Sequence, residues 1–291
     1  MAERLRIVSL VPNGTEILFA LGAGDQVVGV SHECDFPAEA RRLPILTGSA
    51  LAPGLAGAEI DAVVSAQLAG GESLYTLDEA RIVELAPDLI VTQSLCPVCA
   101  VSTAQVDAAV GVLPRCPELL SLDPHTLTDV LGDIRRVGAR LRRESETAAL
   151  LAGLEARLAA VAKRRAGRTR PRVVALEWLD PPFLAGHWVP EMIDQAGGQD
   201  AFGRPGGASR RSSWEEIAGG QPDVVVVMPC GFDQAGAAAE MAKLDACPDW
   251  RALPAVAAGR AFAVDANGLF SRPGPRLVDG VERLAELFDL L

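Results

Sequence analysis

The chain has 291 residues, of which 49% are hydrophobic and 22% are charged, and its formal net charge is −11 at pH 7. This balance is typical of a folded globular protein and excludes a disordered chain. The acidic excess argues against nucleic acid and against an anionic membrane surface as partners, because both require clustered basic side chains.

The first residues are charged and lead directly into an apolar strand at 7–11. They contain no apolar region of signal-peptide length, and no later stretch reaches the roughly 20 apolar residues of a membrane span. We therefore expect a cytoplasmic protein. In that compartment its six cysteines are expected to be free thiols, ligands or redox groups rather than structural disulfides.

The first half of the chain alternates short apolar strands with helical patterns. Strands are predicted at residues 6–10, 27–30, 89–92 and 112–115. Such alternation is typical of a parallel sheet that helices cover on both faces. We interpret residues 1–122 as an N-terminal α/β lobe.

Helical spacing of apolar residues then continues from about residue 126 to 163. One helix of that length would extend roughly 55 Å, at 1.5 Å per residue. We expect it to be a rigid connector within residues 123–167. Strands resume at 172–176, 224–227 and 261–264, so residues 168–291 form a second α/β lobe. The predicted fold is α/β: two Rossmann-like lobes with parallel sheets, joined by one long backbone helix.

Polar and aromatic residues gather just after the predicted strands. In parallel α/β sheets that carboxyl edge is where ligands bind, so we expect a site in the cleft between the lobes. The candidate ligand-binding residues are Asn13, His32, Glu33, Trp178, Asp180, Phe183, His187, Trp188, Phe232, Asp265, Asn267, Phe270 and Arg272.

These residues also have simpler interpretations. The aromatic side chains can be ordinary packing between lobes, and Asp180 can serve only to shape the turn before two prolines. Glu177, Asp180 and His187 can act as acid–base groups, but no nucleophile–base spacing is visible, and we predict no catalytic residue. His125, before the long helix, is interpreted as structural.

Four cysteines follow predicted strands. Cys96 and Cys99 have the C-x-x-C spacing of redox pairs and metal sites, Cys34 follows the second strand, and Cys230 follows the strand at 224–227. Together with His32 they are predicted to meet at the cleft and to hold zinc or an iron–sulfur cluster. The alternatives are a simple redox pair, or small buried hydrophobic side chains.

Several short motifs, taken in order around the helical segment, resemble the class III (helical-backbone) periplasmic binding proteins, and most closely the vitamin B12-binding type. They are IVSLVPNGTE at 7–16, LAPDLIV at 85–91, PPF at 181–183, the glycines at 197–198 and FSRPGPR at 270–276. The resemblance covers about residues 6–290. It implies two lobes that move little and grip a flat ligand; the fold also serves siderophores, haem and metal ions.

The resemblance further implies one acidic residue in each lobe that docks on membrane-protein arginines. In the second half this acid falls on Glu215, whereas the matching position in the first half is Ala80, with Asp78 and Glu79 beside it. Because the pair is incomplete, docking to a membrane transporter is not expected. The chain is interpreted as a monomeric cytoplasmic relative.

The leading hypothesis is that the chain binds a corrinoid or similar metallated macrocycle in the cleft and catalyses nothing. Its small-molecule ligand is the only partner expected, and no further cofactor is identified. The alternative is a cytoplasmic enzyme that depends on a metal, an iron–sulfur cluster or thiol redox chemistry and uses the Cys and His residues at the cleft.

Overall fold

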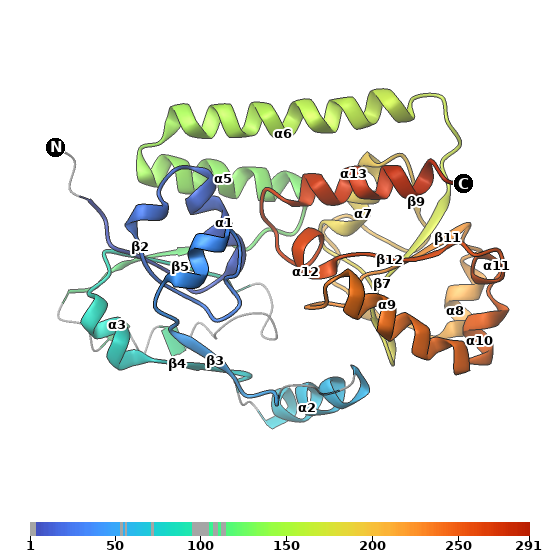
Figure 1. Cartoon of the computed structure of the whole chain (residues 1–291), viewed down its shortest axis with the longest axis horizontal. Coiled ribbons are helices and arrows are strands. Elements are labelled where there is room, and N and C mark those ends of the chain that lie inside the picture. Colours follow the sequence, from blue (N-terminus) through green and yellow to red (C-terminus); the bar gives the residue numbers. More distant parts are fainter. Residues whose placement is uncertain are drawn as a thin grey trace. The chain divides into compact units, whose positions relative to one another are not determined.

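A computed structural model describes residues 4–52, 55, 57–70, 73–94, 105–106, 110–111 and 115–291. The chain divides into two compact units (Figure 1). The first unit comprises Met1–Asp123 and Asp133–Leu150, and the second comprises Pro124–Gly132 and Leu151–Leu291. Each is an α/β structure, which confirms the predicted class.

The first unit contains a four-stranded parallel sheet in the order β2-β1-β5-β6. The strands are β1 (Ile7–Ser9), β2 (Val27–Val30), β5 (Leu89–Thr92) and β6 (Glu118–Ser121). All residues of β1 and β5 are buried, as expected for central strands covered on both faces. The fourth strand begins later than predicted, and residues 112–114 of the predicted strand lie outside the described residues.

The first unit also contains helical elements and a separate two-stranded antiparallel sheet. This small sheet pairs β3 (Thr47–Ser49) with β4 (Tyr75–Leu77), and we call it the hairpin although residues 50–74 separate its two strands. The helical elements are α1 (Pro12–Ala20), η1 (Gly24–Gln26), η2 (Ala38–Arg42), α2 (Gly57–Gly70) and α3 (Glu79–Leu85). Val8, Ile82 and Ile90 belong to one buried cluster, so β1, β5 and α3 share a core.

The prediction of one long connecting helix is wrong. The structure has two helices, α5 (Leu127–Leu141) and α6 (Glu144–Arg165). Arg142 between them has a left-handed backbone with φ of 54°, which a helix cannot contain. The Arg143 amide donates to the Gly138 carbonyl at 2.9 Å, and Gly138 has no side chain that would collide with Thr147. The chain therefore reverses here, and α6 begins beside α5 (Figure 1).

The second unit contains a six-stranded sheet in the order β10-β8-β7-β11-β12, with β9 paired to β7. Its strands are β7 (Arg172–Leu179), β8 (Pro182–Leu184), β9 (Gln199–Asp200), β10 (Arg210–Arg211), β11 (Val224–Val227) and β12 (Ala261–Ala263). β7, β11 and β12 are parallel as predicted, and β9, for which no strand was predicted, is parallel to β7. β8 is antiparallel to both of its neighbours, because the turn at Asp180 and Pro181 sends the chain back along β7.

Besides α6 and the start of α5, the described part of the second unit contains eight helical elements. They are α7 (Val189–Gln195), α8 (Trp214–Gly219), α9 (Gln234–Lys243), η3 (Leu244–Ala246), α10 (Pro248–Ala252), α11 (Pro254–Ala257), α12 (Ala266–Leu269) and α13 (Leu277–Phe288). Arg157 on α6 forms ion pairs with Asp279 and Glu282 on α13, which hold α6 to this unit.

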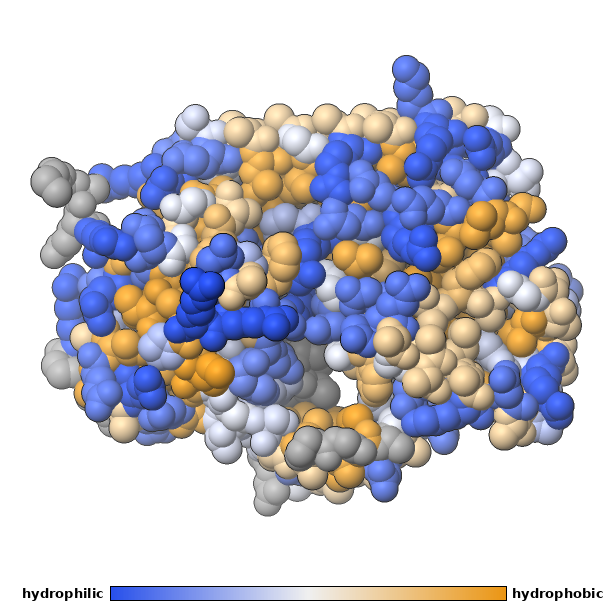
Figure 2. Space-filling model, in the orientation of Figure 1, coloured by the Kyte–Doolittle hydropathy of each residue, from blue (hydrophilic) through white to orange (hydrophobic). Residues whose placement is uncertain are grey.

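Polar and apolar side chains alternate in small groups over the visible face of the molecule (Figure 2). Among the described helices, none combines the length and the apolar character needed to cross a membrane.

Candidate functional site

In the first unit, the carboxyl ends of β1 and β2 bring polar side chains to one edge of the sheet. Ser9 ends β1, and Ser31, His32, Glu33 and Cys34 follow β2. Because β1 and β2 are parallel neighbours, the residues that follow them lie at the same edge. The sequence predicted this placement for His32, Glu33 and Cys34.

Cys34 lies in a small buried hydroxyl cluster. The Thr15 hydroxyl lies 3.1 Å from the Cys34 sulfur and 2.9 Å from the Ser9 hydroxyl oxygen. All three side chains are buried. In this arrangement the cysteine packs against α1 and accepts a hydrogen bond.

The His32 ring is held by the hairpin that faces this edge. Its Nδ1 lies 2.6 Å from the hydroxyl oxygen of Thr47, which also accepts the His32 backbone amide at 3.0 Å. The Thr47 hydroxyl in turn lies 3.1 Å from that of Ser31. With Nδ1 occupied, Nε2 is the nitrogen that can meet a ligand.

Tyr75, on the other strand of the hairpin, adds to the same cluster. Its hydroxyl donates to a carboxylate oxygen of Glu33 at 3.3 Å, and its ring centroid lies 5.6 Å from that of His32. The sequence analysis did not identify Thr47 or Tyr75. They come from a separate antiparallel hairpin, and no local pattern shows which edge a hairpin will face.

Asn13 is at the start of α1, directly after β1. Its side chain is 1% exposed, and its amide nitrogen has no hydrogen-bond partner within the described part of the chain. Leaving a buried donor unpaired costs about 1–3 kcal/mol. The Asn13 side-chain amide can therefore donate a hydrogen bond to a ligand at the carboxyl edge of the sheet, where the sequence predicted this residue to lie.

In the second unit the corresponding edge is aromatic. Trp178 lies near the end of β7 and Phe232 follows β11, and their rings meet edge to face with centroids 6.0 Å apart. Phe183 pairs with Trp178 across the β7–β8 ladder. All three side chains are partly exposed. Their convergence was predicted in part, since Phe183 reaches this edge only through the antiparallel return of β8.

Other predicted residues of this unit are engaged in packing. The Trp188 indole N–H donates to the Phe270 carbonyl at 2.7 Å, and both side chains are buried. Asp265 caps α12 by accepting the Gly268 amide at 2.9 Å. Of the other predicted residues, Asp180 is exposed and Arg272 is buried. The backbone amide of Asn267 donates to the carbonyl of Phe232 at 2.9 Å.

His187 follows β8 and has a left-handed backbone with φ of 54°. Burial, with a smaller contribution from the charge of nearby His125, lowers the pKa of His187 below its ordinary value. The two ring centroids are 6.2 Å apart. The sequence analysis assigned His125 to a structural role and did not anticipate this neighbour.

The cysteine cluster remains a prediction. Cys34 and His32 belong to the first unit and Cys230, which is exposed, to the second, whereas Cys96 and Cys99 lie outside the described residues. Within the ranges that are described, no three His, Cys, Asp or Glu side chains are grouped as metal ligands.

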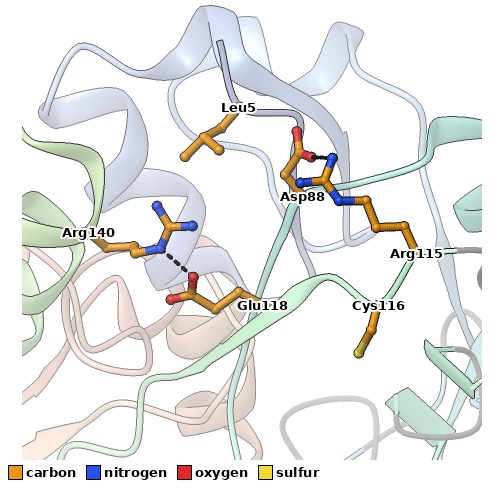
Figure 3. A pocket seen from close by; sticks show the side chains of 6 residues that line it. All are labelled: Leu5, Asp88, Arg115, Cys116, Glu118 and Arg140. Atoms are coloured by element: carbon orange, nitrogen blue, oxygen red, sulfur yellow. Dashed lines mark hydrogen bonds and ion pairs between the residues drawn. The ribbon is translucent and has the colours of Figure 1, made fainter. Parts of the chain in front are cut away.

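A cavity of about 230 Å³ lies at the opposite edge of the first sheet, by the amino ends of β5 and β6 (Figure 3). Two ion pairs line it: Arg115 with Asp88 at 3.4 Å, and Arg140 with Glu118 at 2.5 Å. Its charged lining offers little apolar surface to a flat macrocycle, so we do not assign the ligand to it.

Two α/β units, each with polar or aromatic side chains after its parallel strands, are the architecture expected of a two-lobed binding protein. The chain belongs to the periplasmic binding protein family, whose model matches residues 7–267. The resemblance noted in the sequence is thereby confirmed.

Three relatives illustrate the family. An uncharacterized ABC transporter substrate-binding lipoprotein, YvrC of Bacillus subtilis (strain 168), is 26% identical over 98% of this chain and 80% of its own. The vitamin B12-binding protein of Vibrio cholerae is 25% identical over 96% of this chain and 87% of its own. The apo form of the periplasmic heme-binding protein RhuT from Roseiflexus sp. RS-1 is 26% identical, with a TM-score of 0.70 over 98% of both chains.

These relatives overturn the expectation of a cytoplasmic protein. They include a lipoprotein and a periplasmic protein, and the family as a whole is described as periplasmic. The expectation depended on the composition of the first residues, which does not decide the compartment of the mature protein.

Proposed function

We propose that this chain is a substrate-binding protein for a corrinoid or a similar metallated macrocycle, which it holds with side chains at the carboxyl edges of its sheets. The observation that carries the proposal is the aromatic group of Trp178, Phe183 and Phe232. Flat conjugated or macrocyclic ligands bury large areas against such rings, and each aromatic side chain buried contributes about 1.5–3 kcal/mol.

The carboxyl edge of the first unit offers polar groups instead of aromatic rings. The His32 imidazole, the Glu33 carboxylate and the unpaired amide of Asn13 can meet amide, carboxylate or metal groups at the rim of a macrocycle. Two of the relatives support this ligand class, since one is named for vitamin B12 and another for heme. Family membership favours binding over the alternative of a metal- or thiol-dependent enzyme.

We further propose that the partner of the loaded protein is an ABC transporter, as the name of the Bacillus subtilis relative suggests. Glu215 is exposed in the first turn of α8, which Ser213 caps. Asp78 and Glu79 are exposed at the start of α3. An acidic surface is therefore present in both units, although the position implied by the resemblance is Ala80. Glu215→Gln is expected to lower ligand uptake by cells without changing ligand affinity.

The ligand is tested by calorimetry with cobalamin, cobinamide and haemin on the purified chain. We expect a dissociation constant of micromolar or better for at least one of them, which corresponds to about −8 kcal/mol or stronger. Failure of all three to bind a protein with intact circular dichroism would refute the proposal. Turnover of a bound compound would favour the enzymatic alternative.

A further inference from the structure

Two of the three histidines of the chain meet in the second unit. His125 precedes α5 and His187 precedes α7, and their ring centroids are 6.2 Å apart with 35° between the ring planes. His125 is exposed, whereas His187 is half-buried. We propose that this histidine pair binds a divalent transition-metal ion such as Zn²⁺, at a site independent of the macrocycle.

The separation of the rings suits a shared ion. Histidine nitrogen lies about 2.0–2.1 Å from zinc, so a ring centre lies ~3.2 Å from the ion. Two rings on one ion can then have their centres up to ~6.4 Å apart. That upper limit corresponds to a linear arrangement, whereas the tetrahedral angle that zinc prefers places the centres ~5.2 Å apart. The observed 6.2 Å therefore requires the exposed His125 side chain to move its ring about 1 Å closer to His187 when the ion binds.

The segment that carries His187 is held in place. Its backbone amide donates to the Gly207 carbonyl at 2.6 Å, and its own carbonyl accepts the Gly206 amide at 3.1 Å. The next residue, Trp188, is fixed by its hydrogen bond to Phe270. The Ser209 hydroxyl lies 3.5 Å from Nδ1 of His187, which leaves Nε2 for a metal. Such orientation of the ring by neighbouring groups is typical of metal-binding histidines.

The segment that carries His125 is held as well, and it is tied to the same part of the unit. The Asp129 carboxylate accepts the backbone amides of His125 and Thr126 at 3.1 and 2.9 Å. A carboxylate oxygen of Glu191, on α7, accepts the Leu127 amide at 2.7 Å. The backbone at both histidines is therefore held before the ion binds, so binding costs little conformational entropy.

Electrostatics favour a cation here. Asp129 and Glu191 place two carboxylates beside the histidine segments, where they accept the backbone amides of His125 and Leu127. A metal ion binds the neutral form of imidazole, so zinc affinity is expected to fall as the pH is lowered. Because no third His, Cys, Asp or Glu of the described segments joins them, water would complete the coordination.

The test is Zn²⁺ titration of the untagged, reduced chain by calorimetry at pH 7.5, without any macrocycle. We expect one ion per chain with micromolar affinity, and at least a tenfold weakening in His125→Gln and in His187→Asn. Asparagine is chosen at 187 because it tolerates a left-handed backbone. The control, Asp249→Asn, alters an exposed side chain of α10 and should leave zinc affinity unchanged.

A second measurement keeps the outcome clear if a variant folds poorly. In the native chain, zinc should shift the imidazole nitrogen resonances of His125 and His187 but not those of His32. Zinc binding that survives both substitutions would assign the ion to the thiols and overturn the proposal. Absence of saturable binding up to millimolar zinc would overturn it too. Neither result bears on macrocycle binding, which is measured separately.

Discussion

The carboxyl edges of the two sheets carry different chemistry, although both follow parallel strands. In the first unit, hydroxyl, imidazole and carboxylate groups hydrogen-bond to one another around Thr47. In the second unit, Trp178 and Phe232 present ring surface that is only partly covered. The two edges therefore suit different chemical groups: the aromatic edge suits flat apolar faces, and the polar edge suits groups that form hydrogen bonds.

The largest effect is expected at the aromatic edge. Trp178→Ala should weaken macrocycle binding by about 2–3 kcal/mol, roughly 30- to 150-fold, because it removes a large apolar contact surface. Calorimetry with the ligand that the native chain prefers measures the change.

The matched control for this substitution is Trp214→Ala. Trp214, at the start of α8, packs against Trp250 with ring centroids 5.7 Å apart and against the buried core cluster of the second unit. It should lose stability but retain affinity. Equal losses of affinity in the two variants would mean that Trp178 acts only through the fold.

A smaller effect is expected at the polar edge. Thr47→Val keeps the shape of the side chain but removes the oxygen that accepts the His32 amide and holds its ring. The free energy of unfolding should fall by about 1–2 kcal/mol, the cost of leaving a buried donor unpaired. Urea denaturation measures this loss.

Thr76→Val, on the same hairpin but exposed, is the control and should leave the free energy of unfolding nearly unchanged.

If the polar edge binds the substituents of the ligand, Thr47→Val should also change the preference between cobalamin and cobinamide, whereas Trp178→Ala should weaken the binding of both alike. The same preference in both variants would remove the distinction between the edges.

The smallest effect concerns pH. His187 has a lowered pKa in the folded chain, so the unfolded chain binds more protons and stability rises with pH through this range. The contribution of His187 is fully present above the ordinary histidine pKa of about 6.5 and is lost as pH falls through that value towards the lowered folded pKa. Thermal melting of the native chain and of His187→Asn between pH 5 and 8 should show a shallower pH dependence in the variant. The same dependence of melting temperature on pH in both proteins would contradict the assignment of this effect to His187.

Much of the candidate site follows from local sequence, because strands and the turns after them are short-range features. The buried runs at β5 and β11 predict parallel strands, and polar or aromatic residues after a strand must lie at the carboxyl edge. His32, Trp178 and Phe232 were placed in this way. The family resemblance also rests on local motifs and holds over residues 7–267.

Tertiary structure decided the remainder. Apolar spacing continues through residues 126–163, but the left-handed Arg142 and the close approach of Gly138 to Thr147 reverse the chain. The sequence did not predict this break, because a helical period shows which face of a helix is apolar and not whether the helix is continuous. The partners of His32 and His187, Thr47 and His125, are distant along the sequence and meet them only through a hairpin and the start of α5. Such contacts depend on how elements pack, and residue spacing carries no signal for them.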